Sequence, residues 1–68
     1  MAVMKVVEIM ANSSQSWEDA AQAAVTEASK TLHNIRSLYI KEHSAKVDNG
    51  KIIEYRIIGK LSFELDKK

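Results

Sequence analysis

Residues 37–56, SLYIKEHSAKVDNGKIIEYR, decide the fold, because they predict a long β-hairpin closed at Asn49 and Gly50. The residues alternate over 37–47 and again over 51–65, with the period of two that is typical of strands. Asn-Gly is the pair that a two-residue type I′ turn favours, since both of its central residues need a positive φ. The rest of the chain is expected to pack on this hairpin.

The turn also predicts the strand pairing. Counting back from it sets Asp48 opposite Lys51, His43 opposite Arg56, Ile40 opposite Gly59 and Ser37 opposite Ser62. This register gives the hairpin two faces. The first is expected to pack on a helix and carries Leu38, Ile40, Tyr55, Ile57, Leu61, Phe63 and Leu65. The second is mixed but largely polar and carries Ser37, Tyr39, Lys41, His43, Glu54, Arg56, Ile58 and Lys60.

The segment before the hairpin predicts one strand and one helix. Residues 3–10 are rich in β-branched and sulfur-containing apolar residues and predict a strand, whereas residues 11–16 predict a polar loop. Ser16 and Asp19 resemble a capping box, so the helix is expected to begin near Trp17, which we expect to be a core anchor. Apolar residues at intervals of three and four continue to Ile35, which predicts about five turns. The expected fold class is α+β, with a three-stranded antiparallel sheet wrapped around one amphipathic helix in the order β-α-β-β.

The composition indicates a single domain over residues 1–68 that cannot cover its own core. A chain of 68 residues buries little surface, and 46% hydrophobic residues with only two glycines favour a few long elements, as in an obligate oligomer. The absence of cysteine excludes disulfides and thiolate metal sites. A net charge of +1 gives no electrostatic footprint for nucleic acid. Residues 1–10 lack the apolar run of a signal peptide or membrane span, so we expect a cytoplasmic location, with residues 66–68 as a frayed tail.

The residues that could carry chemistry favour binding over catalysis. The serines and the two histidines are scattered, and neither a phosphate-binding loop nor an HExxH motif is present, so we expect no enzyme activity. The second hairpin face combines Tyr39 with several cations, among them Arg56, and this combination suits a planar anionic ligand. An interface or a solvated face would carry the same residues.

Over essentially its whole length the chain resembles the dodecins, which are small flavin-binding proteins. The resemblance rests on the order and spacing of VVEI, SWEDAAQAAV, ASKTL, DNGKIIEYR and LSFELD. It implies a β-α-β-β fold, a hollow homododecamer built from trimers, and storage, buffering or quenching of riboflavin, FMN or FAD without catalysis.

The family pattern places the flavin site on particular residues of this chain. The tryptophan that stacks on the flavin ring falls on Ser37, the glutamine that bonds the polar edge of the ring falls on Arg56, and the basic residue that contacts phosphate falls on Ser44, with Lys46 two residues on. Tyr39 could supply part of the lost stacking. We therefore take Ser37, Tyr39, Arg56 and Lys46 as the candidate cofactor-binding residues, with no metal ligand assigned.

Two hypotheses follow. In the first, the protein binds FMN or riboflavin at an altered and weakened site. In the second, it is a dodecin-like shell that no longer binds flavin and instead holds another anion or a metal ion, or serves as an assembly.

Overall fold

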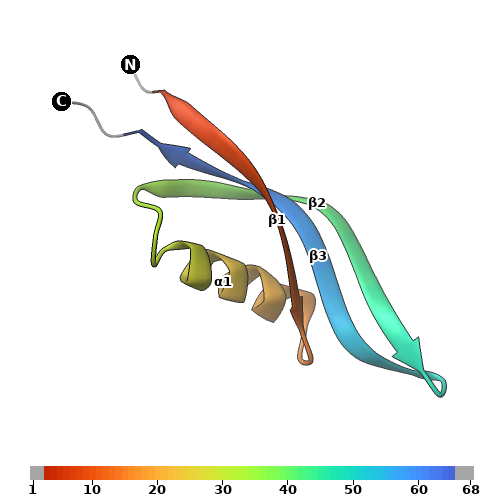
Figure 1. Ribbon diagram of the computed structural model, residues 1–68. Coiled ribbons are helices and arrows are strands. Elements are labelled where there is room, and N and C mark those ends of the chain that lie inside the picture. The colour runs from red at the N-terminus through yellow and green to blue at the C-terminus, as the bar shows by residue number, and fades with distance from the viewer. Residues whose placement is uncertain (1–2, 66–68) are drawn as a thin grey trace.

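The computed structural model describes residues 3–65 and confirms the predicted β-α-β-β fold (Figure 1). The elements are β1 (Met4–Ser13), α1 (Trp17–Ala28), β2 (Ile35–Asp48) and β3 (Lys51–Glu64). The three strands form one antiparallel sheet in the order β1-β3-β2, and α1 lies on one side of it. The tail expected at residues 66–68 lies outside the described residues.

Helix α1 begins where predicted. The Ser16 hydroxyl accepts a hydrogen bond of 2.9 Å from the backbone N–H of Asp19, which confirms the serine half of the expected capping box. Glu18 and Asp19 add negative charge to the first turn, where the helix dipole favours it.

The helix ends at Ala28 and does not continue to Ile35, so the prediction of five turns was wrong. The Ser29 hydroxyl donates to the carbonyl of Val25 at 2.7 Å, and Asn34 then takes a positive φ of 63°, which redirects the chain into β2. Ile35 is the half-buried first residue of β2. Its spacing from the preceding apolar residues matches that of a helix, although it lies in a strand, and this match is why the sequence predicted a longer helix. Strand β1 also runs three residues further than expected, to Ser13.

The turn of the hairpin is as predicted, with φ of 54° at Asn49 and 77° at Gly50. The pairs next to the turn and at the far end are also confirmed: Asp48 with Lys51, Ile40 with Gly59 and Ser37 with Ser62. Between them the register slips twice in opposite directions, which leaves Ile53 and then Lys41 out of the pairing.

The slips overturn one predicted pair and one predicted face. His43 lies opposite Ile57, and the partner of Arg56 is Ser44. Because Lys41 is the extra residue of a bulge, His43 turns to the helix side of the sheet, where its ring meets that of Trp17 edge-on at 5.9 Å. His43 therefore does not share a face with Arg56, as the unbroken register had predicted.

The core between α1 and the sheet is small. Its buried side chains are Ala20, Ile57, Leu61 and Phe63. Leu38, Ile40 and Tyr55 of the expected packing face are half-buried, but Leu65 is exposed. Trp17 anchors the helix start as expected, since its ring packs edge-on against Tyr55 at 4.9 Å and its Nε1 donates to the carbonyl of Ser44 at 2.9 Å.

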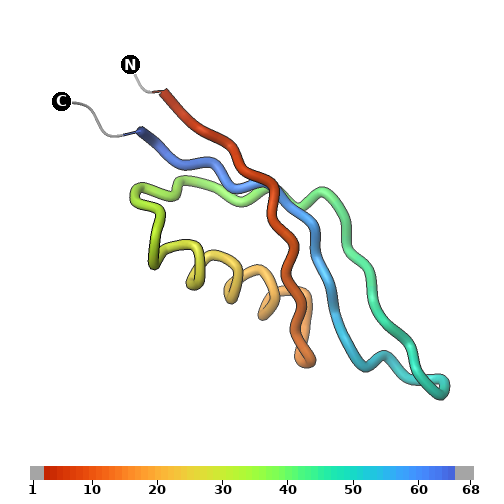
Figure 2. The backbone as a smooth tube through the Cα atoms, viewed as in Figure 1, coloured from red at the N-terminus to blue at the C-terminus, as the bar shows by residue number. Residues whose placement is uncertain are grey.

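The sheet is much longer than the helix that covers it. The molecule measures 54 × 20 × 13 Å, and the tip of the β2–β3 hairpin extends well past α1 (Figure 2). Over residues 3–65, no helix has both the length and the apolar character needed to cross a membrane.

Gly59 is the position at which the central strand has no room for a side chain. A Cβ atom there would lie 2.6 Å from the backbone oxygen of Tyr39 and 3.1 Å from Cδ1 of Leu38. We predict that Gly59→Ala lowers the free energy of unfolding by about 1–3 kcal/mol, because β2 must shift away from β3. Urea unfolding measures the loss, with Lys60→Ala at the exposed neighbouring position as control. Equal midpoints for the two variants would show that β2 approaches β3 less closely than described.

Candidate functional site

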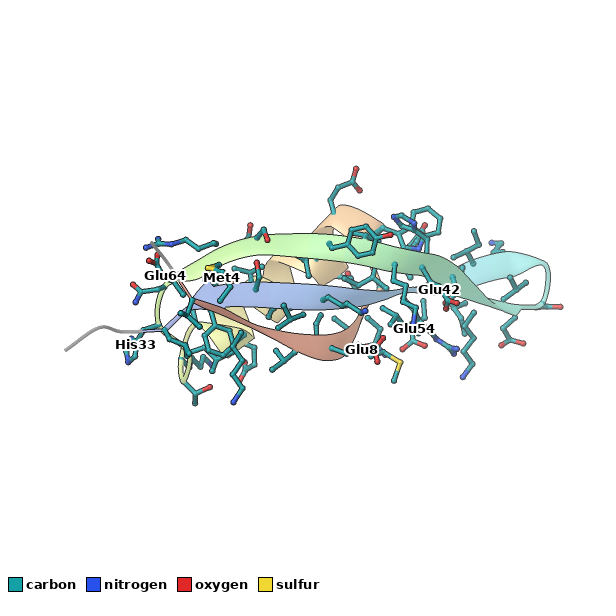
Figure 3. The ribbon with its side chains drawn as sticks, turned by 90° about the horizontal axis from the view of Figure 1, so that it is seen from above. Met4, Glu8, His33, Glu42, Glu54 and Glu64 are labelled. Carbon is teal, nitrogen blue, oxygen red and sulfur yellow. The ribbon has the colours of Figure 1, made fainter. Side chains whose placement is uncertain are left out.

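The side of the sheet away from α1, here called the open face, carries all four residues predicted to bind a ligand. The pairing places Ser37 and Tyr39 on this face opposite Ser62 and Lys60, and Lys46 opposite Glu54. Strand β1 contributes Val6, Glu8, Met10 and Asn12, which alternate with residues that point to the helix. In Figure 3, Glu64 and His33 mark the end of the sheet opposite the hairpin tip, and Glu42 and Glu54 lie between the two ends.

Ser37 offers a hydroxyl and no ring at the position to which the family pattern assigns the stacking tryptophan. Its hydroxyl is hydrogen-bonded to the hydroxyl of Ser62 across the two strands. Tyr39, two residues further along β2, is 65% exposed. The open face therefore has one accessible aromatic ring close to Ser37, two positions away from where the pattern expects it.

Arg56 belongs to a cluster of polar side chains on the same face. Its Nε donates to one carboxylate oxygen of Glu54 at 3.1 Å, and the side-chain amide of Asn12 donates to the other at 2.7 Å. The Arg56 and Glu54 side chains are 40% and 31% exposed, so solvent screens this ion pair only in part. The cluster, with Met10 and Ala11, lines an open hollow of about 300 Å³.

The ion pair leaves part of the guanidinium available. It engages Nε, whereas the terminal amino groups of Arg56 lie outside it. Those groups are donors of the kind that bind a carboxylate or a phosphate, and Arg56 is one of the residues that line the hollow. Arg56 is thus held in place by Glu54 while keeping donors for an anionic ligand.

Ser37 and Arg56 share the open face but lie at different places along it. Ser37 is opposite Ser62, six residues from Arg56 on β3, which corresponds to about 20 Å along the strand. Lys46 lies at the Arg56 end, two residues beyond Ser44. A small ligand that touches both Ser37 and Arg56 must therefore take them from different copies of the chain.

Sequence reasoning missed Asn12, because it ended the first strand at Met10 and placed residue 12 in a loop. Glu8, Met10 and Asn12 share the open face, and β1 runs to Ser13. Residues 11–16 are small or polar, so no alternation in the sequence marked this extension of the strand. It also missed the ion pair of 3.3 Å between Lys41 and Glu8, which joins β2 to β1 across the open face. Within the described part of the chain, no three His, Cys, Asp or Glu side chains gather as a metal site would require.

Comparisons of the whole chain with known proteins identify one family. The family model described as Dodecin matches residues 3–66. The chain is 38% identical over 65 residues to calcium dodecin from Mycobacterium tuberculosis, covering 96% of this chain and 92% of that protein. It is 31% identical over 65 residues to a dodecin from Thermus thermophilus, covering 96% and 94%.

Solved structures show the same fold. A mutant of the Thermus thermophilus dodecin superposes with a TM-score of 0.92 at 30% identity, covering 98% of this chain and 100% of that one. The structure of the Mycobacterium tuberculosis calcium dodecin, described as calcium-chelating and as having a novel calcium-binding site, superposes with a TM-score of 0.80 at 39% identity, covering 97% and 94%. By sequence and by fold, this chain belongs to the dodecin family.

Proposed function

We propose that the protein is a non-enzymatic dodecin that stores or buffers a small ligand, assembles as a homododecamer built from trimers, and has an altered and weakened flavin site. Family membership supports the ligand-storage role. The small core and the uncovered open face support the assembly, because burial between copies would remove apolar surface that one helix cannot cover.

The observation that carries the weakened flavin site is the distribution of aromatic residues. The chain has one tryptophan, two tyrosines and one phenylalanine. Trp17, Tyr55 and Phe63 lie on the helix side, packed with each other or in the core, so Tyr39 is the aromatic residue of the open face. Stacking on one aromatic platform contributes about 1–3 kcal/mol, so a serine in place of tryptophan costs roughly ten- to a hundred-fold in affinity for each ring.

The residues that remain favour a ligand with negative charge. Arg56 lines the hollow and keeps donors outside its ion pair, and Lys46 lies two residues from Ser44, which pairs with Arg56. A phosphate gains charge-assisted hydrogen bonds from such groups, whereas a neutral ring system does not. Among the flavins, FMN is therefore expected to bind better than riboflavin.

Calcium is a second candidate ligand, favoured by the 38% identity to a protein named calcium dodecin. Ca²⁺ takes six to eight oxygen ligands. Within residues 3–65, a single copy of this chain does not bring even three His, Cys, Asp or Glu side chains together, so a calcium site would need ligands from several copies. On the open face Glu8 is paired with Lys41, and both carboxylate oxygens of Glu54 accept hydrogen bonds. Glu42 lies outside the ion pairs of the described residues, so we infer that it is the carboxylate best placed to join a calcium site formed between copies.

We predict that the oligomer of the unaltered protein leaves riboflavin fluorescence largely unquenched at micromolar concentration. We further predict that Ser37→Trp increases the affinity for riboflavin and FMN by roughly ten-fold or more, because this variant restores the aromatic platform. Arg56→Gln in the Ser37→Trp background should reduce the preference for FMN. Fluorescence titration measures both effects, and Ser14→Trp in the exposed loop is the matched control. Full quenching by the unaltered protein would contradict the weakened site.

We predict that, if calcium is the ligand, Glu42→Gln lowers calcium affinity by about ten-fold or more, since a ligand carboxylate loses its charge while its size is kept. Isothermal titration with calcium chloride measures the affinity of the intact oligomer. Glu18→Gln, at an exposed position on α1, should leave it unchanged. Equal affinities for the two variants would exclude Glu42 as a ligand, and no heat of binding in the unaltered protein would exclude calcium.

A further inference from the structure

The helix side of the sheet carries a second hollow, separate from the one at Arg56 and here called the helix-side hollow. It has a volume of about 240 Å³ and is bordered by the start of α1 and by parts of β2 and β3. Its walls combine two rings, one carboxylate and three apolar side chains: Trp17, Glu18, Ala21, Ile40, His43 and Ile57. Pockets for small molecules have this composition, mostly apolar with a few polar groups, and this volume suits a ligand smaller than a drug.

The Trp17 ring in this hollow is held by three contacts within the same copy. Its Nε1 donates to the carbonyl of Ser44 at 2.9 Å, and it meets the rings of Tyr55 and His43 edge-on at 4.9 and 5.9 Å. His43 reaches this side of the sheet because of the bulge at Lys41, and bulges often re-aim side chains next to functional sites. A ring that is already fixed loses little conformational entropy when a ligand binds against it.

The charge at the helix-side hollow is negative. Glu18 is exposed and takes part in no ion pair of residues 3–65, and no Lys or Arg of these residues lines the hollow. Asp19, which accepts a hydrogen bond of 2.6 Å from the Ser13 hydroxyl, adds a second carboxylate to the same turn. Together the two carboxylates exceed the roughly half positive charge that the helix dipole places at this end. A positively charged ligand therefore finds an unpaired carboxylate beside an aromatic ring.

We propose that the helix-side hollow binds a small organic cation, an alkylated ammonium group that contacts the Trp17 ring and has Glu18 as its counter-ion. Aromatic rings attract cations to their faces, and tryptophan does so most strongly. Alkyl groups on the nitrogen suit the apolar walls formed by Ala21, Ile40 and Ile57. A bare Ca²⁺ ion would need more oxygen ligands than this one carboxylate offers. Binding here does not depend on the proposed function, because the hollow lies on the opposite side of the sheet from the open face.

Trp17 reports on the hollow directly, because it is the one tryptophan of the chain. Choline, a small quaternary ammonium alcohol, is titrated into the intact protein, and both the Trp17 emission and the NMR line width of the choline methyl protons are followed. We expect saturable binding, with an affinity about ten-fold higher for choline than for the neutral alcohol in which carbon replaces the nitrogen. Equal affinities for the two alcohols, or no change in either signal with choline, would overturn the proposal.

A space-filling variant locates the binding in the hollow. Ala21→Leu fills part of the hollow with a residue that is also a strong helix former, so the chain should fold and choline binding should be lost. Gln22→Leu is the matched control, since residue 22 is the exposed neighbour on α1 outside the walls of the hollow, and it should bind choline as the unaltered protein does. Circular dichroism checks that both variants are folded. Choline binding that survives in folded Ala21→Leu would place the cation elsewhere and contradict the assignment.

A charge variant at an exposed position tests the counter-ion without altering the packing. Glu18→Gln keeps the size of the side chain and removes its charge, so the affinity for choline should fall by roughly two- to five-fold, as for other exposed ion pairs. The affinity for the neutral alcohol should not change. Glu27→Gln, at another exposed position of α1 outside the hollow, should bind choline as the unaltered protein does. Equal choline affinities for the two variants would show that Glu18 is not the counter-ion, and the proposal would be wrong.

Discussion

The mismatch between one short helix and two long strands is the constraint on which the rest of the structure depends. β2 and β3 have 14 residues each and extend about 46 Å, whereas the 12 residues of α1 extend about 18 Å. The core under the helix therefore covers only the part of one face that lies away from the hairpin tip, from Ile57 to Phe63. Apolar side chains stay exposed at the hairpin tip and on much of the open face, where Val6 and Met10 are 55% and 73% exposed, and within residues 3–65 no helix covers either surface.

Much of this fold could be predicted from the sequence, because the decisive signals are local. Asn49 and Gly50 specify their own turn, and Ser16 caps the helix through its own hydroxyl. The bulges at Lys41 and Ile53 could not be predicted. Residues 41–44 are all polar and residues 52–53 are both isoleucine, so neither stretch has an alternation that a slip would visibly break. The slip at Lys41 is nevertheless what turns His43 from the open face to Trp17.

The shared face of the candidate residues could be predicted, but their separation along the sheet could not. The family pattern identified Ser37 and Arg56, and the structure places both on the open face, yet their separation along β3 makes each the centre of a different surface. The Ser37 hydroxyl is hydrogen-bonded to the hydroxyl of Ser62. Arg56 is oriented by its hydrogen bond to the Glu54 carboxylate, which also accepts a hydrogen bond from the Asn12 amide. Under the proposed function, charge and hydrogen bonds replace the ring stacking of the family pattern, and the site is completed where copies meet.

Self-assembly is the central claim, because the proposed ligand site and the covering of the exposed apolar surface both require more than one copy. Sedimentation equilibrium at micromolar concentration measures it most directly. We predict a single stable species with twelve times the 7.6 kDa mass of one chain. A folded monomer or dimer that stays stable at that concentration would contradict the account.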